Sequence, residues 1–216
     1  MLVLWESGNS NAQAKFGCGP TGSTNTWDKV NGLVTGATKS LGDNNGKISL
    51  AELTGNADAC HVNLFGIENP WGWYWQMIQG IYFGNSNNSG QTGSEAFVYK
   101  GNRMPSDSEL TGHPVSDYRT FTRNINSGWI LSLVLGDFFD IMPKNVGGDN
   151  SANYYCDYSW ASSTGQLLLF GGRAGSALLC GSFYVGSDNG FGYRNTNYGV
   201  RLAFYGNPTY VNGADL

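Results

Sequence analysis

Side chains that could carry out covalent or metal chemistry are few and scattered in this chain of 216 residues. The four cysteines have no CxxC pair and no Cys/His cluster of the kind that binds zinc. They are Cys18, Cys60, Cys156 and Cys180. His61 lies in an apolar run and His113 precedes Pro114, so neither forms the pattern of a nucleophile with its base. We therefore expect no catalytic residue, no metal site and no cofactor.

An incomplete calcium-loop pattern occurs in GDNNGKISLAEL. Asp43, Gly46 and Glu52 fall at the third, sixth and twelfth positions of an EF-hand loop, but Leu41 stands at the first position, where the loop requires a carboxylate. A hairpin turn at Asp43–Gly46 explains the same residues more simply. We expect a turn here and no calcium site.

The residue types best suited to binding are concentrated at 167–206. Two apolar runs, Leu167–Phe170 and Val200–Tyr205, read as buried strands that open and close this stretch. Between them lie Gly, Ser, Asn, Tyr and Arg, including Tyr193 and Arg194, which are types that binding surfaces use. The expected ligand contacts are Phe170, Arg173, Ala174, Ser176, Leu178, Leu179, Ser182 and Tyr184. Their apolar members, if the core does not need them, would form an exposed interaction patch.

Strands upstream and downstream must position this stretch. CHVNLFGI, beginning at Cys60, reads as a buried strand, and WYWQMIQGIYF, ending at Phe83, alternates in the manner of a sheet with one buried side. We interpret Trp71, Trp73 and Trp75 as core residues, with a carbohydrate platform as the alternative. The apolar run at Gly128–Pro143 predicts a strand, a turn and a second strand. Arg201, within the closing apolar run, would need carboxylate or carbonyl partners if it is buried.

Composition restricts the class of protein. Charged residues make up 13% of the chain, the net charge is −4 and there is no Lys/Arg run, which disfavours nucleic-acid binding. With 32 glycines and 14% aromatics, the sequence favours a loop-rich fold of short strands. No signal peptide and no membrane insertion are expected. The cysteines then read as mostly free, buried thiols, with a Cys156–Cys180 disulfide left open.

Several short motifs, in this order, resemble a known family. Gly171-Gly172, the step Cys180–Tyr184 and the residues Asn197, Gly199, Arg201 and Leu202 resemble the C-terminal variable region of diversity-generating-retroelement target proteins. These are phage and bacterial proteins with a C-type lectin fold of the formylglycine-generating-enzyme subtype. GIENPWGWYWQMIQGI (Gly66–Ile81) resembles that subtype's G-N-x-W-E-W strand, and YYCDY (Tyr154–Tyr158) resembles the start of the variable region.

The resemblance implies a single α+β domain over 1–216, with short antiparallel strands, few helices, many loops and a variable region at about 153–206. It implies a ligand-binding display protein: a phage receptor-binding or tail-tip protein, or a bacterial surface protein, in the virion or on the cell surface. Its ligand would be a protein or a glycan on a bacterial cell, and homo-oligomerisation is left open. Adenine-directed variation is less compatible with Trp160 and Gln166, and Gly171, Gly172, Gly181 and Arg201 match the fixed scaffold. The residues compatible with such variation are Phe170, Arg173, Ala174, Ser176, Leu179, Ser182 and Tyr184.

Two other functions compete with this one. The first is a carbohydrate-binding lectin domain of a phage tail fibre, but Glu68-Asn69-Pro70 has the residue types of the Glu-Pro-Asn sugar motif in the wrong order. The second is a formylglycine-generating-type enzyme, whose chemistry needs a close pair of cysteines near the C-terminal end. Cys156 and Cys180 are far apart in the sequence. Specific protein binding is therefore the leading hypothesis.

Overall fold

The computed structural model describes residues 15–21, 35–51, 57–100, 118–135, 141–147 and 157–199, called the described residues below. They are mostly β-sheet with almost no helix, and 3-10 turns occur at η1 (Lys39–Leu41) and η3 (Ala177–Leu179). The prediction of short strands with few helices is confirmed. The α+β class is not, because apolar residues here come in short alternating or continuous runs interrupted by glycine, which suit strands and not helices.

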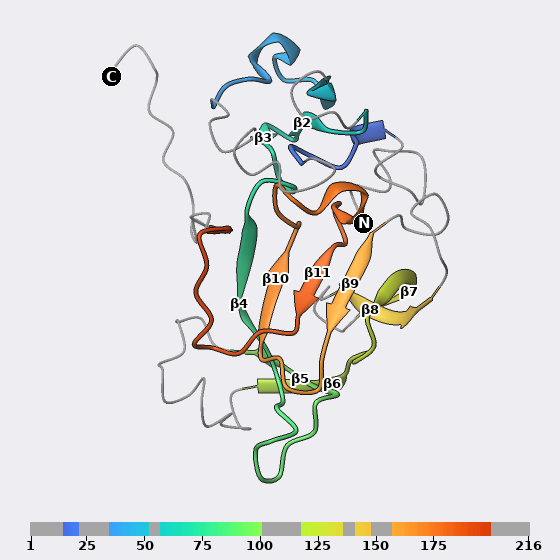
Figure 1. Ribbon diagram of the computed structural model, residues 1–216, viewed down its shortest axis with the longest axis vertical. Helices are drawn as coiled ribbons and strands as arrows, with labels where there is room; N and C mark the ends of the chain where they lie inside the picture. Colours follow the sequence, from blue (N-terminus) through green and yellow to red (C-terminus); the bar gives the residue numbers. More distant parts are fainter. Residues whose placement is uncertain are drawn as a thin grey trace.

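Two sheets lie one above the other (Figure 1). The small sheet has the order β1-β2-β3, and the large sheet has the order β6-β5-β4-β10-β11-β9-β7-β8, with β12 paired to β4. Neighbouring strands are antiparallel, except that β11 runs parallel to β9 and β12 runs parallel to β4.

The small sheet comprises β1 (Gly46–Ser49), β2 (Cys60–Leu64) and β3 (Ile67–Glu68). The large sheet comprises β4 (Trp75–Phe83), β5 (Glu95–Tyr99), β6 (Tyr118–Thr122), β7 (Gly128–Leu135), β8 (Ile141–Val146), β9 (Tyr158–Ala161), β10 (Leu167–Phe170), β11 (Val185–Ser187) and β12 (Tyr198–Gly199).

Most of the strands predicted from the sequence are confirmed. Every residue of β2 is buried, including His61 and Asn63, so the prediction of a buried strand is confirmed. The Trp-rich strand begins at Trp75, and the run at Gly128–Pro143 forms the antiparallel pair β7–β8. The turn expected at Asp43–Gly46 follows η1 and leads into β1. The second anchoring run, Val200–Tyr205, and Arg201 within it lie outside the described residues.

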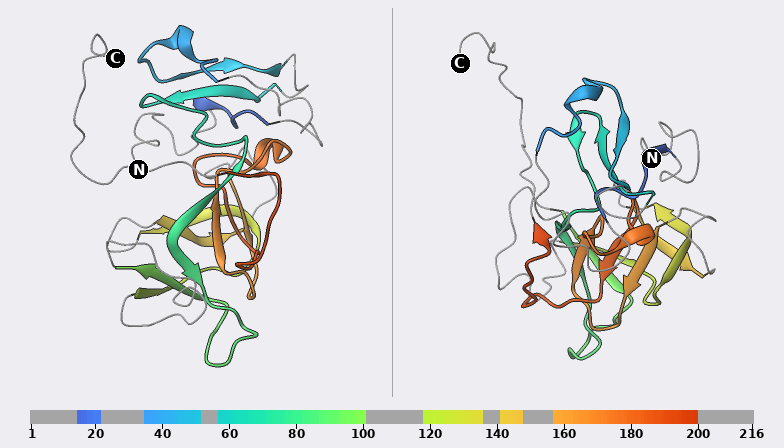
Figure 2. Two further views of the ribbon diagram at one scale, coloured as in Figure 1. Left: turned by 90° about the vertical axis from the view of Figure 1, so that its left-hand side faces the viewer. Right: turned by 45° about the horizontal axis from the view of Figure 1, so that its top comes forward.

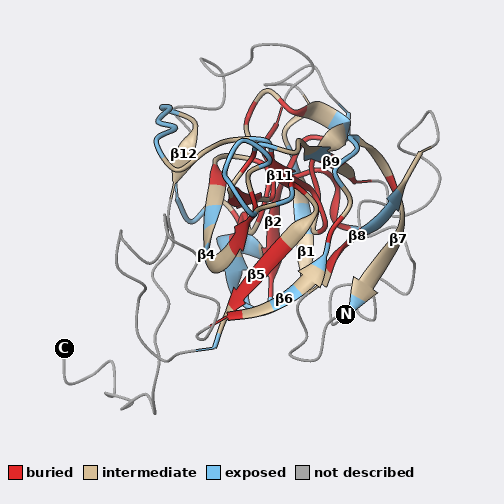
Figure 3. Cartoon of the chain, turned by 90° about the horizontal axis from the view of Figure 1, so that it is seen from below, coloured by how far each residue is buried: buried red, intermediate tan, exposed pale blue. Residues whose placement is uncertain are grey.

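The large sheet is curled and has a core on each face. Figure 3 shows the sheet from below, and one of its faces is packed by a cluster of buried residues. It comprises Phe83, Ala96, Met142, Leu168 and Val185. The opposite face carries a second cluster of Cys18, Trp75, Leu169, Cys180 and Tyr184. Both faces are thus used for packing, and the segments that cover the second face decide which residues reach the surface.

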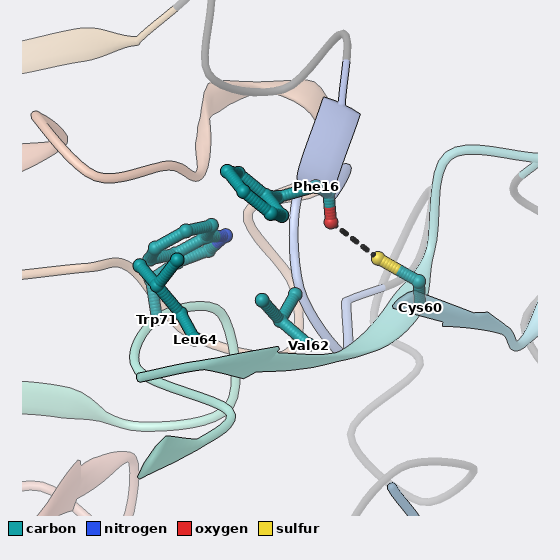
Figure 4. Packing of buried hydrophobic residues seen from close by; sticks show 5 residues of the cluster. All are labelled: Phe16, Cys60, Val62, Leu64 and Trp71. Atoms are coloured by element: carbon teal, nitrogen blue, oxygen red, sulfur yellow. Dashed lines mark hydrogen bonds between the residues drawn. The ribbon is translucent and has the colours of Figure 1, made fainter. Parts of the chain in front are cut away.

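The segment 15–21 lies between the two sheets (Figure 2). Its Phe16 packs with Val62, Leu64 and Trp71 in the core of the small sheet, and the Cys60 thiol donates a 3.0 Å hydrogen bond to the Phe16 carbonyl (Figure 4). Two residues later, Cys18 joins the cluster on the large sheet. This segment therefore connects the cores of the two sheets.

A buried arginine joins several segments of the large sheet through hydrogen bonds to their backbone carbonyls. The Arg123 guanidinium, just after β6, lies 4.0 Å from the ring of Phe83. It donates hydrogen bonds to backbone carbonyls of Gly93, Ser162, Gly165 and Ser187. Arg123 is buried, and these four carbonyls replace the water that the charge has lost.

In the part of the chain that the structure describes, no helix is long and apolar enough to span a membrane. The same ranges contain no group of three or more His, Cys, Asp or Glu side chains that could hold a metal ion.

Candidate functional site

The loop 171–184 connects β10 to β11, and two glycines start it. Gly171 and Gly172 have φ of 86° and 81°, a region that side-chain-bearing residues rarely adopt. A Cβ on Gly172 would lie 2.3 Å from the Cys180 sulfur, and one on Gly171 would lie 3.1 Å from Trp71. The Gly171 carbonyl accepts a 2.8 Å hydrogen bond from the Gly72 amide. Glycine is thus required at both positions, because the turn needs positive φ and because Trp71 and Cys180 lie too close for a Cβ.

Thr21 holds the middle of this loop from a position 153 residues before Ala174. Its buried hydroxyl donates to the Ala174 carbonyl at 3.0 Å and accepts from the Ala177 amide at 2.8 Å. Ala177 has φ of 50°, an uncommon conformation for a residue other than glycine, and this bond helps to maintain it. Sequence reasoning missed Thr21, because a lone threonine in a polar run carries no local signal of such a contact.

Asp157 holds the end of the loop. Its fully buried carboxylate accepts a hydrogen bond from the Phe183 amide. A Cβ at Gly181 would lie 1.8 Å from the carboxylate, so only glycine fits there without rearrangement. The neighbouring Cys180 is a free, buried thiol whose pKa is raised to about 12, chiefly by burial. It stays protonated at neutral pH and acts as a packing residue.

The free thiols agree with the sequence prediction for three of the cysteines. Cys18, Cys60 and Cys180 are all buried and unbridged. Cys180 therefore does not form the Cys156–Cys180 disulfide that the sequence left open. Cys156 itself lies outside the described residues.

Three of the eight predicted contact residues are buried instead of exposed. Tyr184 is only 2% exposed, and its ring lies 4.6 Å from that of Trp75. Ala174 is buried at the Thr21 contact, and the Ser176 hydroxyl accepts from the Arg173 amide at 3.2 Å. The expectation that these side chains lie on the surface is wrong, because the second face of the large sheet needs them as its cover.

The other five predicted residues lie further out. Leu178, at the tip of the loop, is 38% exposed. The remaining four are intermediate in burial: Phe170, Arg173, Leu179 and Ser182. The apolar residues of the expected patch are therefore one exposed residue, Leu178, and two half-buried residues, Phe170 and Leu179, and Arg173 is a half-buried cation of the same loop.

A second segment, 188–199, borders the same cluster as the loop. Tyr198 and Leu179 both pack against the cluster that contains Trp75 and Tyr184. The segment is held in place because the Trp75 amide donates a 2.9 Å hydrogen bond to the Asn197 carbonyl. Tyr193 is 43% exposed, with its ring 5.3 Å from that of Tyr198. Burial raises the pKa of Tyr198, while the charge of Arg173 acts in the opposite direction, which places Arg173 within electrostatic reach of this segment.

Three buried polar atoms of this region have no hydrogen-bond partner. They are Trp73 Nε1, Ser182 Oγ and Asn197 Oδ1. Unpaired buried groups are uncommon, and these three atoms are covered by protein, so they lie beneath the surface and not on it. We call Arg173, Leu178, Ser182, Tyr193 and Tyr198 the loop surface. The chemistry that it offers is ring contact, hydrogen bonding and positive charge.

No family model, no curated protein and no solved structure matches this chain. We therefore infer the function from the geometry of the loop surface and from the motifs in the sequence.

Proposed function

We propose that this protein is a ligand-binding display protein of C-type-lectin-like architecture, in which the loop surface contacts a target protein. The motifs shared with diversity-generating-retroelement proteins support this proposal, as does the residue composition of the loop surface. The expected setting is a phage tail tip or a bacterial cell surface, and the net charge of −4 disfavours a nucleic-acid ligand.

The observation that carries the proposal is the way in which Thr21 holds the loop. Thr21 contacts the backbone of Ala174 and Ala177, and Asp157 contacts the backbone of Phe183. Hydrogen bonds to the backbone do not depend on which side chains the loop carries. The outward side chains, such as Arg173 and Leu178, can therefore change identity while the loop keeps its conformation.

This arrangement divides the expected contact residues into two classes. Tyr184, Ala174 and Ser176 belong with the fixed scaffold, because their burial makes them part of the packing. The positions suited to diversification are the half-buried and exposed ones, with Arg173 and Leu178 at their centre.

Two matched libraries would test the proposal. One randomises the codons of Arg173, Leu178, Ser182 and Tyr193, and the other randomises those of Thr21, Gly172, Gly181 and Tyr184. Each is displayed on yeast, scored for resistance to protease, and selected against a panel of purified bacterial outer-surface proteins. We expect most members of the first library to stay folded and to yield binders, and most members of the second to lose protease resistance. Equal loss of fold in both libraries, or no binder from the first, would contradict the proposal.

The gene itself offers a separate test of diversification. The complete genome that carries the gene should contain a near-identical template repeat beside a reverse-transcriptase gene, with differences confined to template adenines. We expect the codons of Arg173, Leu178 and Ser182 to differ between the two copies and the codon of Tyr184 to be the same. A genome without such a repeat would remove the retroelement part of the proposal and leave the display function to the library test.

A further inference from the structure

Three aromatic rings form a row on β7 and β9, apart from the loop surface. Trp129 and Tyr158 are register partners, and their ring centroids lie 5.3 Å apart. Tyr158 and Trp160 are two residues apart on one strand, so their side chains share a face, and their centroids lie 4.9 Å apart. Both Trp rings therefore contact that of Tyr158, with the Trp129 ring inclined to it by 87°. Figure 1 shows β7 and β9 at the side of the sheet away from β4.

Trp160 is held in a single orientation although it is 40% exposed. Its indole Nε1 donates a 2.7 Å hydrogen bond to the hydroxyl of Tyr184, which is buried. On its other side, the Tyr158 ring is inclined to the indole by 50°. Because the polar edge of the indole is already bonded, what Trp160 offers to solvent is ring surface. A ring fixed in advance loses little conformational entropy when a ligand stacks on it.

The two sequence segments that carry this row contain no charged residue, although the buried Arg123 guanidinium bonds to the carbonyls of Ser162 and Gly165, and Asp188, just after β11, is exposed. Residues 124–135 and 158–166 contain Asn, Ser, Thr and Gln but no Asp, Glu, Lys or Arg. Asp157, next to Tyr158, is fully buried beneath the loop. Asn126 and Ser127, just before β7, are exposed, and Ser127 bonds to the backbone of Ala161 at the end of β9. Lys144 lies beyond, on β8, which pairs with the other edge of β7.

We propose that Trp160 and Trp129 form a binding platform for a neutral saccharide. The C–H face of a pyranose ring is weakly positive and matches the electron-rich face of an indole. The hydroxyl groups of a sugar match the uncharged, exposed side-chain amide of Asn126, whereas the Ser127 hydroxyl is already bonded to the Ala161 backbone. An anionic ligand such as a nucleic acid or an acidic lipid would need basic residues, which these segments lack. This platform does not depend on the proposed function of the loop surface.

The experiment is calorimetric titration of the full chain with neutral hexasaccharides, namely cellohexaose, maltohexaose and chitohexaose. A glycan array of neutral and acidic glycans extends the set, and hexagalacturonate is the acidic counterpart. We expect saturable binding of at least one neutral glycan and none of the acidic one. Trp160→Ala should weaken the binding at least tenfold, and Trp129→Ala should weaken it less. Leu178→Ala, a matched change at an exposed apolar residue of the loop surface, should leave it unchanged.

Thermal melting of each variant separates loss of binding from loss of fold. If Trp160→Ala melts early, Trp160→Phe keeps a ring at this position and should retain binding within about threefold, while Trp129→Ala still reports on the platform. The proposal is overturned if no neutral glycan binds, if hexagalacturonate binds as tightly as the neutral glycans, or if the change at Trp160 leaves the dissociation constant unaltered. Loss of glycan binding in Leu178→Ala alone would place the glycan on the loop surface and also overturn it.

Discussion

The indole N–H of Trp160 donates a 2.7 Å hydrogen bond to the hydroxyl of Tyr184, and this bond joins a half-exposed ring on β9 to the most deeply buried ring of the loop 171–184. Tyr184 packs in turn on Trp75 at 4.6 Å. Burial, with a contribution from Cys180, raises the pKa of Tyr184, so the hydroxyl stays protonated at physiological pH. The platform is thus connected to the buried cluster beneath the loop 171–184 through one side chain.

Replacing Tyr184 should test this connection first through stability. Tyr184→Phe removes the acceptor for the Trp160 indole and should lower the free energy of unfolding by about 1 kcal/mol. Tyr184→Ala also leaves a cavity beside Trp75 and should cost about 3–5 kcal/mol. Urea unfolding measures both values. A Tyr184→Ala protein that melts like the wild type would show that this ring is a surface group, as the sequence alone had indicated.

The glycine pair can be tested with a matched glycine elsewhere. Gly172→Ala introduces a Cβ that would lie 2.3 Å from the Cys180 sulfur, at a backbone position with φ of 81°. We expect a loss of about 2 kcal/mol or more from strain and overpacking together. Gly192→Ala, where a Cβ meets nothing within 4 Å, should be nearly neutral. Thermal melting of the two variants side by side is the measurement, and equal melting temperatures would argue against the described turn.

Thr21→Val keeps the shape of the side chain and removes the hydroxyl that holds the loop. The Ala174 carbonyl and the Ala177 amide then lose their buried partner, which should cost about 1–3 kcal/mol. Thr164→Val, at an exposed threonine, is the control. Hydrogen exchange at residues 173–179 should rise in Thr21→Val before exchange in β10 does. Unchanged exchange in the loop would show that Thr21 does not maintain its conformation.

Glu68 makes the stability of the small sheet depend on pH. Burial raises the pKa of Glu68, but hydrogen bonds from Thr38 and Gly36 outweigh it, so the pKa lies below the ordinary 4.5. A lowered folded-state pKa contributes stability above the unfolded value, and that stability is lost as the pH falls through the folded value. Glu68→Gln should therefore unfold at lower urea than the wild type at pH 7, and the gap should close below pH 4.5. Asp43→Asn, at an exposed carboxylate of the adjacent turn, should show a smaller gap.

Arg123 should be among the most sensitive positions in the large sheet. Arg123→Met keeps the length of the side chain but leaves the carbonyls of Gly93, Ser162 and Gly165 without their donor. We expect a loss of about 3 kcal/mol or more, since several buried acceptors become unpaired at once. Lys144→Met, at an exposed cation on β8, should be within about 0.5 kcal/mol of the wild type. Urea unfolding compares the two, and similar midpoints would contradict the described burial of Arg123.

The strands could be predicted from the sequence because the signal for a strand is local. The short apolar run of β10 follows from the residue types alone, whereas the burial of His61 and Asn63 in β2 depends on hydrogen bonds to other segments. The α+β class was not confirmed, because few of the apolar residues in the described ranges are spaced as they are on a helix. Register and sheet order, such as the parallel pairing of β11 with β9, could not be predicted, because they depend on contacts between distant segments.

The sequence predicted where the candidate site lies but not which contacts hold it, because those contacts join segments that are distant in the sequence. The Gly-Gly turn was found because glycine has a local conformational signature, whereas the roles of Thr21 and Asp157 depend on distant partners. Tyr184 was expected on the surface, since tyrosine serves both cores and interfaces and its type does not distinguish them. The sequence pointed to Arg201 as an arginine with a buried guanidinium. In the described residues, Arg123 is an arginine of this kind.

The contacts of segment 15–21 also set an order of events during folding. The loop 171–184 cannot reach its final conformation until Thr21, made 153 residues before Ala174, returns to meet it. On the ribosome, Phe16 can pack with Val62 and Leu64 early, while Cys18 and Thr21 must wait until β10 and the loop have emerged. Contacts that close so long a stretch of chain form slowly. We therefore expect the small sheet to gain protection first in pulse-labelled refolding, and the loop to gain it in the last kinetic phase.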